Sequence, residues 1–138
     1  MNVFEKTFRD LFRKTDILWD PRYTGKTCIS RLDRNLLVKL FFIEQWDLGQ
    51  FDAICVCIIN RTGGLIDQQI FCFQDMVPER MGEHNTAGYY PYVELCAGDA
   101  KWHDAPLSLA EQKLIRNAIL NYVEAYLDID QPMRNHCL

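Results

Sequence analysis

The sequence lacks a long apolar segment. Its longest apolar run, Leu36 to Ile43, is interrupted by Lys39 and is far shorter than the roughly 20 residues that cross a bilayer as a helix. The first six residues mix charges with aromatics and lack the basic and apolar regions of a secretory signal. We therefore expect no membrane association and a cytoplasmic location.

Glycine and proline are also scarce, at 7 and 5 residues, and no internal repeat or low-complexity tract occurs. These absences exclude collagen-like, solenoid and disordered classes. With 49% hydrophobic and 25% charged residues, the 138-residue chain has an ordinary globular composition. We expect one domain at residues 1–130, followed by a loosely ordered tail at 131–138 that has no periodic apolar pattern.

The six cysteines are an even number, which would suggest disulfides in a short secreted chain. Their surroundings indicate otherwise. Cys55 and Cys57 lie two residues apart in an apolar, strand-like run, and most of the others lie among apolar residues. Because buried thiols behave as small hydrophobic groups and a cytoplasmic compartment keeps them reduced, we expect reduced cysteines.

The formal charge of −4 is spread unevenly. Residues 1–73 contain 10 basic and 9 acidic groups, whereas residues 74–138 contain 5 basic and 10 acidic groups. A general nucleic-acid binder usually has a basic stripe and a high pI. Residues 1–39 do carry a local excess of four positive charges, but charges on the outer side of a helix usually contact solvent. We expect no nucleic-acid partner.

Two amphipathic helices are predicted at the ends of the chain. Asn2 and Glu5 are typical of a helix start, and apolar residues at helical spacing follow over residues 3–14. Ser108 and Glu111 form a capping box that begins a second helix. Its apolar stripe is broad, and its members are Leu114, Ile115, Ala118, Ile119, Tyr122, Val123 and Tyr126.

Between these helices, short β-branched and aromatic runs alternate with turn residues, which predicts strands. The Gly63-Gly64 pair indicates a tight hairpin. Residues 19–25 are interpreted as a loop, and 75–81 as a short helical turn. A fifth strand containing Pro91 is placed at a sheet edge, where a missing N–H does least harm. The predicted strands are 27–33, 36–46, 53–60, 65–73 and 89–96.

The pattern therefore predicts an α+β fold, with a five-stranded antiparallel meander sheet flanked by an N-terminal and a C-terminal helix packed on one face. Helices on one face leave the other to solvent, a partner or a ligand. We expect function to lie there or at a sheet edge, including pairing with a second copy of the chain.

Groups capable of chemistry are concentrated between residues 94 and 104. Cys96, His103, Asp99 and Glu94 are the catalytic candidates, because a thiol beside an imidazole and a carboxylate can act as a nucleophile. Such a role requires the imidazole to lie within hydrogen-bond reach of the sulfur.

Metal and nucleotide signatures are absent. Cys55-Val56-Cys57 has one intervening residue where zinc knuckles need two to four, and Thr24-Gly25-Lys26-Thr27 lacks the earlier glycine of a phosphate-binding loop. No metal or cofactor is expected, and an enzyme is the less favoured class.

Aromatic residues near loops are the stronger indication of a binding surface, because Tyr and Trp bring large area with few rotatable bonds. The leading hypothesis is an interaction or regulatory domain that binds a protein partner through these aromatics and an open sheet face or edge. The candidate partner-binding residues are Tyr89, Tyr90, Tyr92, Trp102, Trp46 and Trp19.

Two alternatives remain open. One is a small enzyme that uses Cys96 and His103. The other is an inhibitor whose acidic half imitates nucleic acid, which requires the carboxylates to line one surface. The mimic candidates are Asp75, Glu79, Glu83, Glu94, Asp99 and Asp104.

Overall fold

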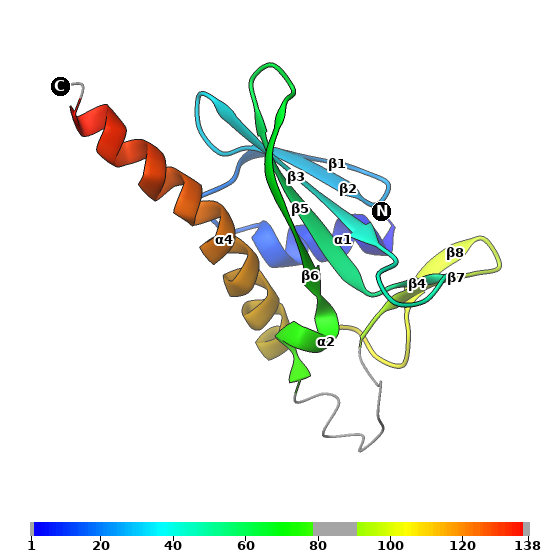
Figure 1. Cartoon of the computed structure of the whole chain (residues 1–138). Helices are drawn as coiled ribbons and strands as arrows, with labels where there is room; N and C mark the ends of the chain where they lie inside the picture. The colour runs from blue at the N-terminus through cyan, green and yellow to red at the C-terminus, as the bar shows by residue number, and fades with distance from the viewer. Residues whose placement is uncertain (1, 79–90, 137–138) are drawn as a thin grey trace.

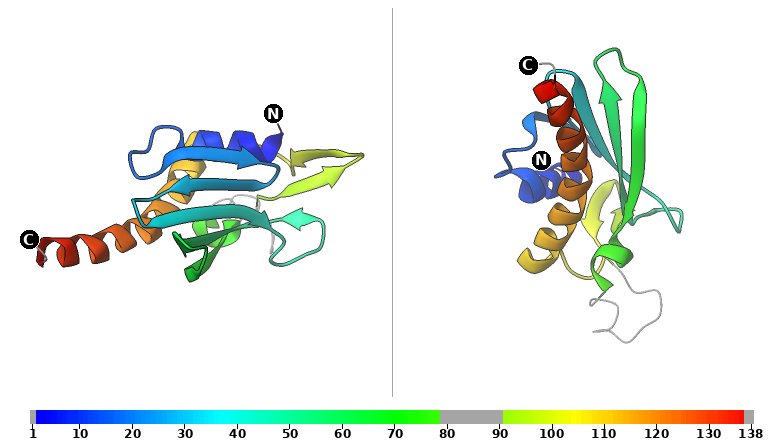
Figure 2. Two further views of the ribbon diagram at one scale, coloured as in Figure 1. Left: turned by 90° about the horizontal axis from the view of Figure 1, so that it is seen from above. Right: turned by 60° about the vertical axis from the view of Figure 1, so that its left-hand side comes forward.

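The computed structural model describes residues 2–78 and 91–136, with side chains through residue 127. Figure 1 shows a five-stranded antiparallel sheet, two long helices and a smaller sheet at one end. Both long helices lie on the same side of the large sheet, as the right-hand view of Figure 2 shows. The predicted α+β class, with an antiparallel five-stranded sheet between N-terminal and C-terminal helices, is confirmed.

Helix α1 (Val3–Phe12) begins where the sequence predicts. The Asn2 side chain caps the helix by accepting the backbone N–H of Glu5 at 2.8 Å. The apolar side of α1 is buried, with Phe8 and Leu11 fully inaccessible to solvent.

The large sheet has the strand order β1-β2-β3-β5-β6, and every neighbouring pair is antiparallel. Short turns join β1 to β2, β2 to β3 and β5 to β6, whereas residues 44–52 connect β3 to β5. The turn at Gly63 has the positive φ of 91° that glycine tolerates. The strands are β1 (Trp19–Thr24), β2 (Thr27–Arg31), β3 (Leu36–Ile43), β5 (Ala53–Asn60) and β6 (Leu65–Cys72).

The interpretation of residues 19–25 as a loop is wrong, because β1 occupies Trp19–Thr24 and pairs with β2. Pro21 lies at a register shift between Trp19 and Arg22 on the edge of the sheet. At an edge, the missing N–H of proline faces away from the neighbouring strand and costs no ladder hydrogen bond.

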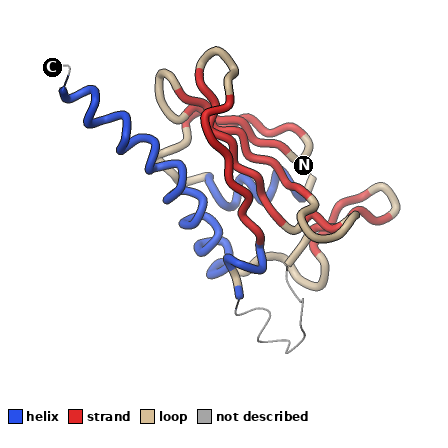
Figure 3. The backbone as a smooth tube through the Cα atoms, in the orientation of Figure 1, coloured by secondary structure: helices blue, strands red, loops and turns tan. Residues whose placement is uncertain are grey.

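The predicted fifth strand at 89–96 belongs to a different sheet. Of its described residues, Pro91 and Tyr92 lie outside any strand, and β7 (Val93–Cys96) pairs with β8 (Asp99–Trp102) on one side and with the two-residue β4 (Gln50–Phe51) on the other. The predicted edge strand containing Pro91 is therefore wrong, because β7 is central in its sheet and begins after the proline. Figure 3 shows this three-stranded sheet projecting from one end of the large sheet. At Ala97 and Gly98, with φ values of 52° and 83°, the chain turns back, so that β8 pairs with β7 as a hairpin.

The described residues also include α2 and α4. The short α2 (Phe73–Met76) follows β6 directly, two residues before the helical turn that the sequence predicts. The Ser108–Glu111 capping box forms with reciprocal bonds of 3.1 and 2.8 Å, and α4 (Leu109–His136) follows. Because α4 continues to His136, most of the predicted tail is helical, while residues 137 and 138 lie outside the described residues.

The hydrophobic core lies between the helices and the large sheet. Phe42 of β3 is at its centre, with ring centroids 5.0 Å from Phe4, 5.1 Å from Phe8 and 5.9 Å from Phe73. From α4, Ile115, Ile119 and Val123 enter the core without solvent exposure.

Candidate functional site

The large sheet has one face against the helices and one face, here called the outer face, pointing away from them. Val38, Leu40 and Phe42 of β3 are fully buried toward the helices. Side chains alternate along a strand, so Leu37 and Phe41 point to the outer face. No helix among the described residues covers this face (Figure 2).

Apolar side chains from four strands lie on the outer face, with Lys39 of β3 opposite Ile29 among them. Directly opposite residues of antiparallel strands share a face, and the register places Leu37 opposite Ile59. Phe41 lies opposite Cys55, which in turn lies opposite Ile70 of β6. Ile70 is 40% exposed, and Ile29 of β2 is 45% exposed. We call Leu37, Ile59, Phe41, Ile70 and Ile29 the apolar patch.

Two thiols lie within the apolar patch. The Sγ atoms of Cys55 and Cys57 are 3.9 Å apart, and neighbouring side chains keep both residues below 10% exposure. Burial, followed by the neighbouring Cys57, raises the pKa of Cys55 to about 11. The Cys55 thiol is therefore protonated and unreactive at neutral pH. None of the five cysteines in the described part of the chain forms a disulfide.

Four arginines border one end of the apolar patch. Arg34 and Arg61 come from the β2–β3 and β5–β6 turns, which lie side by side in Figure 1. They line a shallow hollow of ≈ 400 Å³ with Arg31. An adjoining hollow of ≈ 380 Å³ lies between Arg31 and Arg22 and includes Ile29. We call Arg22, Arg31, Arg34 and Arg61 the arginine rim.

Two carboxylates line the same hollows. Asp20 forms an ion pair with Arg22 at 3.7 Å, and both side chains are more than half exposed. The Asp33 carboxylate accepts two backbone N–H groups of its own turn, at 2.7 and 3.0 Å. Within the described residues, no ion pair is recorded for the other three arginines of the rim. This end of the outer face therefore carries an excess of positive charge.

A buried carboxylate holds the loop at the opposite end of β3. Asp52 is fully buried and accepts the backbone N–H groups of Gln45 at 2.6 Å and Trp46 at 3.1 Å. These bonds fix a loop that presents the half-exposed Trp46. Burial, followed by the carboxylates of Asp75 and Asp52, raises the pKa of the Cys72 thiol, and the opposing effect of the nearby Trp46 indole N–H is smaller.

The β7–β8 hairpin brings some of the catalytic candidates together. The rings of Tyr92 and His103 stack with centroids 4.5 Å apart, and His103 Nδ1 lies 3.9 Å from a Glu94 carboxylate oxygen. Burial, followed by the carboxylates of Glu94 and Asp47, raises the pKa of Tyr92.

The same hairpin separates Cys96 from His103. Cys96 is opposite Asp99 beside the turn, whereas the His103 N–H bonds to the carbonyl of Tyr92 at the far end. Four residues of strand correspond to about 13 Å. The imidazole is therefore out of hydrogen-bond reach of the sulfur, and the structure does not assemble the nucleophilic pair.

The acidic candidates come from separate elements. Glu94 and Asp99 share one face of the hairpin, but Glu94 is opposite Lys101. Asp75 lies on α2, and Asp104 follows β8 with a positive φ of 65°. The described carboxylates thus form no continuous row. Two further candidates, Glu79 and Glu83, lie outside the described residues.

The aromatic candidates differ in exposure. Trp19 and Trp46 are 48% and 52% exposed. Trp102 instead packs against the core, with its ring 5.7 Å from that of Phe73. Tyr89 and Tyr90 lie outside the described residues.

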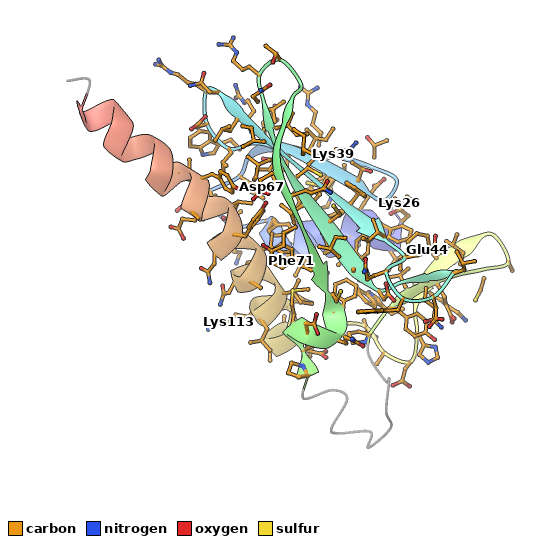
Figure 4. All side chains as sticks on the ribbon, viewed as in Figure 1. Lys26, Lys39, Glu44, Asp67, Phe71 and Lys113 are labelled. Atoms are coloured by element: carbon orange, nitrogen blue, oxygen red, sulfur yellow. The ribbon has the colours of Figure 1, made fainter. Side chains whose placement is uncertain are left out.

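One polar cluster joins β6 to α4 on the helix side of the sheet, at Asp67, which is labelled in Figure 4. The Asp67 carboxylate accepts a hydrogen bond from Tyr122 at 2.9 Å and another from Tyr126. These bonds, that of Tyr126 first, lower the pKa of Asp67. Burial, followed by the bond to Asp67, raises the pKa of both tyrosines.

In the part of the chain that the structure describes, no three potential ligands gather as a metal site. No helix there is long and apolar enough to cross a membrane. Comparisons with protein-family models, curated proteins and solved structures find no match to this chain.

Sequence patterns indicated an open sheet face but not the residues that line it. Neither Ile29 nor Arg31 was a candidate, because only the order of the strands in the sheet brings these residues together with the others on the outer face. A sequence signal did exist, since Ile29 and Arg31 alternate with the buried Cys28 and Ser30. However, the alternation alone does not show which of the two pairs of side chains faces the helices and which faces away.

Proposed function

We propose that this chain is a protein-interaction domain whose outer face binds an acidic segment of another protein. The observation that carries the proposal is the combination of the apolar patch with the arginine rim. Contiguous exposed apolar side chains with a polar border are characteristic of interaction surfaces.

The apolar patch supplies the driving force for association. Ile29 and Ile70 retain 45% and 40% of their accessible surface. Burying apolar surface against a partner is worth roughly 25 cal/mol per Å² before the costs of association. Since Leu37 and Ile59 are opposite one another in the register, the contact area is continuous across β3 and β5.

The arginine rim supplies the preference for negative charge. Guanidinium groups bind carboxylates in a bidentate geometry, and arginine is enriched at the energetic centres of interfaces. The two hollows between the rim residues are wide and shallow, which suits side chains of a protein segment lying across the strands.

A protein partner is favoured over a nucleic acid by the side chains of the patch. Sheets that bind single-stranded nucleic acids stack bases on aromatic platforms. Four of the five residues of the apolar patch are aliphatic. The fifth is Phe41, and the Lys39 ammonium lies over its ring, 5.5 Å from the centroid. A nucleic-acid base would have to displace this ammonium before it could stack on the ring. Figure 4 shows Lys39 over the middle of the sheet.

Site-specific photo-cross-linking tests this function. A cross-linking residue is placed at Ile29 in the full chain, and in a matched control at Leu114, which is 49% exposed on α4. We expect one protein to be captured in the native host from position 29 and not from position 114. Its cross-linked peptide should contain acidic and apolar residues.

The captured partner is then titrated with purified chain. The charge reversal Arg31→Glu should weaken binding by about tenfold or more, and added salt should reduce the affinity of the wild type. Equal capture from both positions, or unchanged affinity of the Arg31→Glu variant, would contradict the proposal.

A further inference from the structure

Two cysteines on the outer face turn their sulfur atoms toward each other. Cys55 and Cys57 of β5 are separated by one residue, so they lie on the same face of the strand. Backbone positions two residues apart in a strand are about 6.6 Å apart. The two Sγ atoms are only 3.9 Å apart, and no disulfide joins them. The side chains therefore converge and present two thiols as a pair.

Polar side chains of the neighbouring strands cover part of this pair. Cys57 lies between Lys39 of β3 and Gln68 of β6 in the register, and its thiol donates a weak hydrogen bond to Gln68 Oε1 at 3.7 Å. Both cysteines are buried, whereas Gln68 is exposed and Lys39 is half-buried. Because this cover consists of flexible side chains and not of backbone, a single ion can reach the sulfur atoms when those side chains rotate.

We propose that Cys55 and Cys57 bind one Cu(I) ion as a two-coordinate site. Soft thiolate ligands select Cu(I), and a monovalent ion of this kind is satisfied by two sulfur ligands. On binding, each thiol releases its proton to solvent and one sulfur–copper bond forms at each cysteine. The copper enters and remains as Cu(I), so nothing is oxidised or reduced.

The separation of the sulfur atoms fits one shared ion. Metal–thiolate bonds of about 2.3 Å allow two sulfur ligands of the same ion to be at most about 4.6 Å apart, in a linear arrangement. The observed 3.9 Å lies within this limit. Rotation about the Cα–Cβ bonds opens the angle at the ion, so the site forms without movement of the strand backbone.

Zinc is a poorer match to the same residues. Structural zinc sites use four protein ligands in a tetrahedral arrangement. Within the ranges that the structure describes, no three His, Cys, Asp or Glu side chains gather around a common point. Zinc would therefore have two of its four ligands, whereas Cu(I) would have its full set.

Lys39 provides a positive charge beside the proposed site. Two thiolates and one monovalent ion carry one net negative charge, which is costly in a buried position unless it is paired. Lys39 lies directly opposite Cys57, and its ammonium lies over Phe41, the residue opposite Cys55. Among the described residues, no carboxylate is recorded in an ion pair with Lys39. Its charge can therefore offset that of the copper site.

The copper site is independent of the proposed protein partner. Its ligands are buried beneath the side chains that would contact a partner, and its test requires the chain and the ion alone.

Anaerobic competition with the colorimetric Cu(I) chelator bicinchoninate tests the inference on the full chain. The wild type is expected to withdraw one equivalent of Cu(I) from the chelator. Cys55→Ala and Cys57→Ala should each weaken binding by more than about 100-fold, because changes to residues behind metal ligands already cost 10–100-fold in affinity. The matched control is Cys96→Ala, which removes an exposed thiol and should bind like the wild type.

X-ray absorption of the copper-loaded wild type gives a readout that does not depend on the folding of a variant. We expect two sulfur neighbours and no nitrogen or oxygen at bonding distance. Circular dichroism shows whether each variant is folded. A wild type that leaves Cu(I) on the chelator would overturn the inference. So would folded Cys55→Ala and Cys57→Ala variants that bind like the wild type, an equal loss in Cys96→Ala, or copper bound through nitrogen or oxygen.

Discussion

Replacing Phe42 by alanine should destabilise the protein far more than replacing its neighbour Phe41. Phe42 is fully buried, and its ring contacts Phe4 and Phe8 at centroid distances of 5.0 and 5.1 Å. Truncating such a phenylalanine typically costs about 3–5 kcal/mol, a large share of the 5–15 kcal/mol that stabilises a domain. Phe41 lies on the outer face and is only partly buried, so its truncation should cost about 1 kcal/mol.

Urea unfolding followed by tryptophan fluorescence measures both values. With a denaturant slope of about 2 kcal/mol per M, the midpoint should fall by about 2 M for Phe42→Ala and by about 0.5 M for Phe41→Ala. Equal losses would refute the reasoning. They would mean either that the outer face is covered or that the register of β3 is shifted by one residue.

Three further predictions concern single groups. Asp52→Ala should cost about 2–4 kcal/mol in urea unfolding, because the backbone N–H groups of Gln45 and Trp46 lose their buried charged acceptor; a loss within 0.5 kcal/mol, the scale of surface changes, would contradict this. Tyr126→Phe should raise the pKa of Asp67 in a carboxyl NMR titration. Since this folded-state pKa is depressed, the stabilisation exists above the unfolded pKa of about 3.9 and is lost as pH falls through the folded value. Native alkylation at neutral pH should modify the exposed Cys96 and spare Cys28, whose pKa burial raises to about 12; rapid modification of Cys28 would contradict its burial.

The helices were predictable because their starts depend on local chemistry. The Asn2 cap and the Ser108–Glu111 capping box act within four residues, and both form as predicted. The hairpin at Gly63 was predictable for the same reason, since its turn requires a conformation that few residues adopt.

The errors occurred where neighbouring strands override local propensity. Pro21 and Asp20 resemble loop residues, yet pairing with β2 makes them part of an edge strand. The strand containing Val93 shows a clear β pattern, but its pattern does not say which sheet it joins. That choice depends on β4, whose two residues are too few to be recognised in the sequence.

The candidate site was predictable only in outline. Helices on one face imply an open opposite face, and no helix among the described residues lies over that face. Arg34 and Arg61 are far apart in the chain, and they come together because β2–β3 and β5–β6 turn at the same end of the sheet. Cys96 and His103 are close in sequence but lie at opposite ends of a hairpin, so their proximity in the chain was misleading.

The most direct test of the central claim compares one substitution on two sides of the molecule. Ile29→Glu changes the outer face, and Leu114→Glu changes a leucine of similar exposure on α4. Both affinities for the cross-linked partner are measured by calorimetric titration. We predict that Ile29→Glu weakens binding by about tenfold or more while Leu114→Glu leaves it unchanged. Equal effects of the two substitutions, or a loss confined to Leu114→Glu, would contradict the assignment of the outer face as the binding surface.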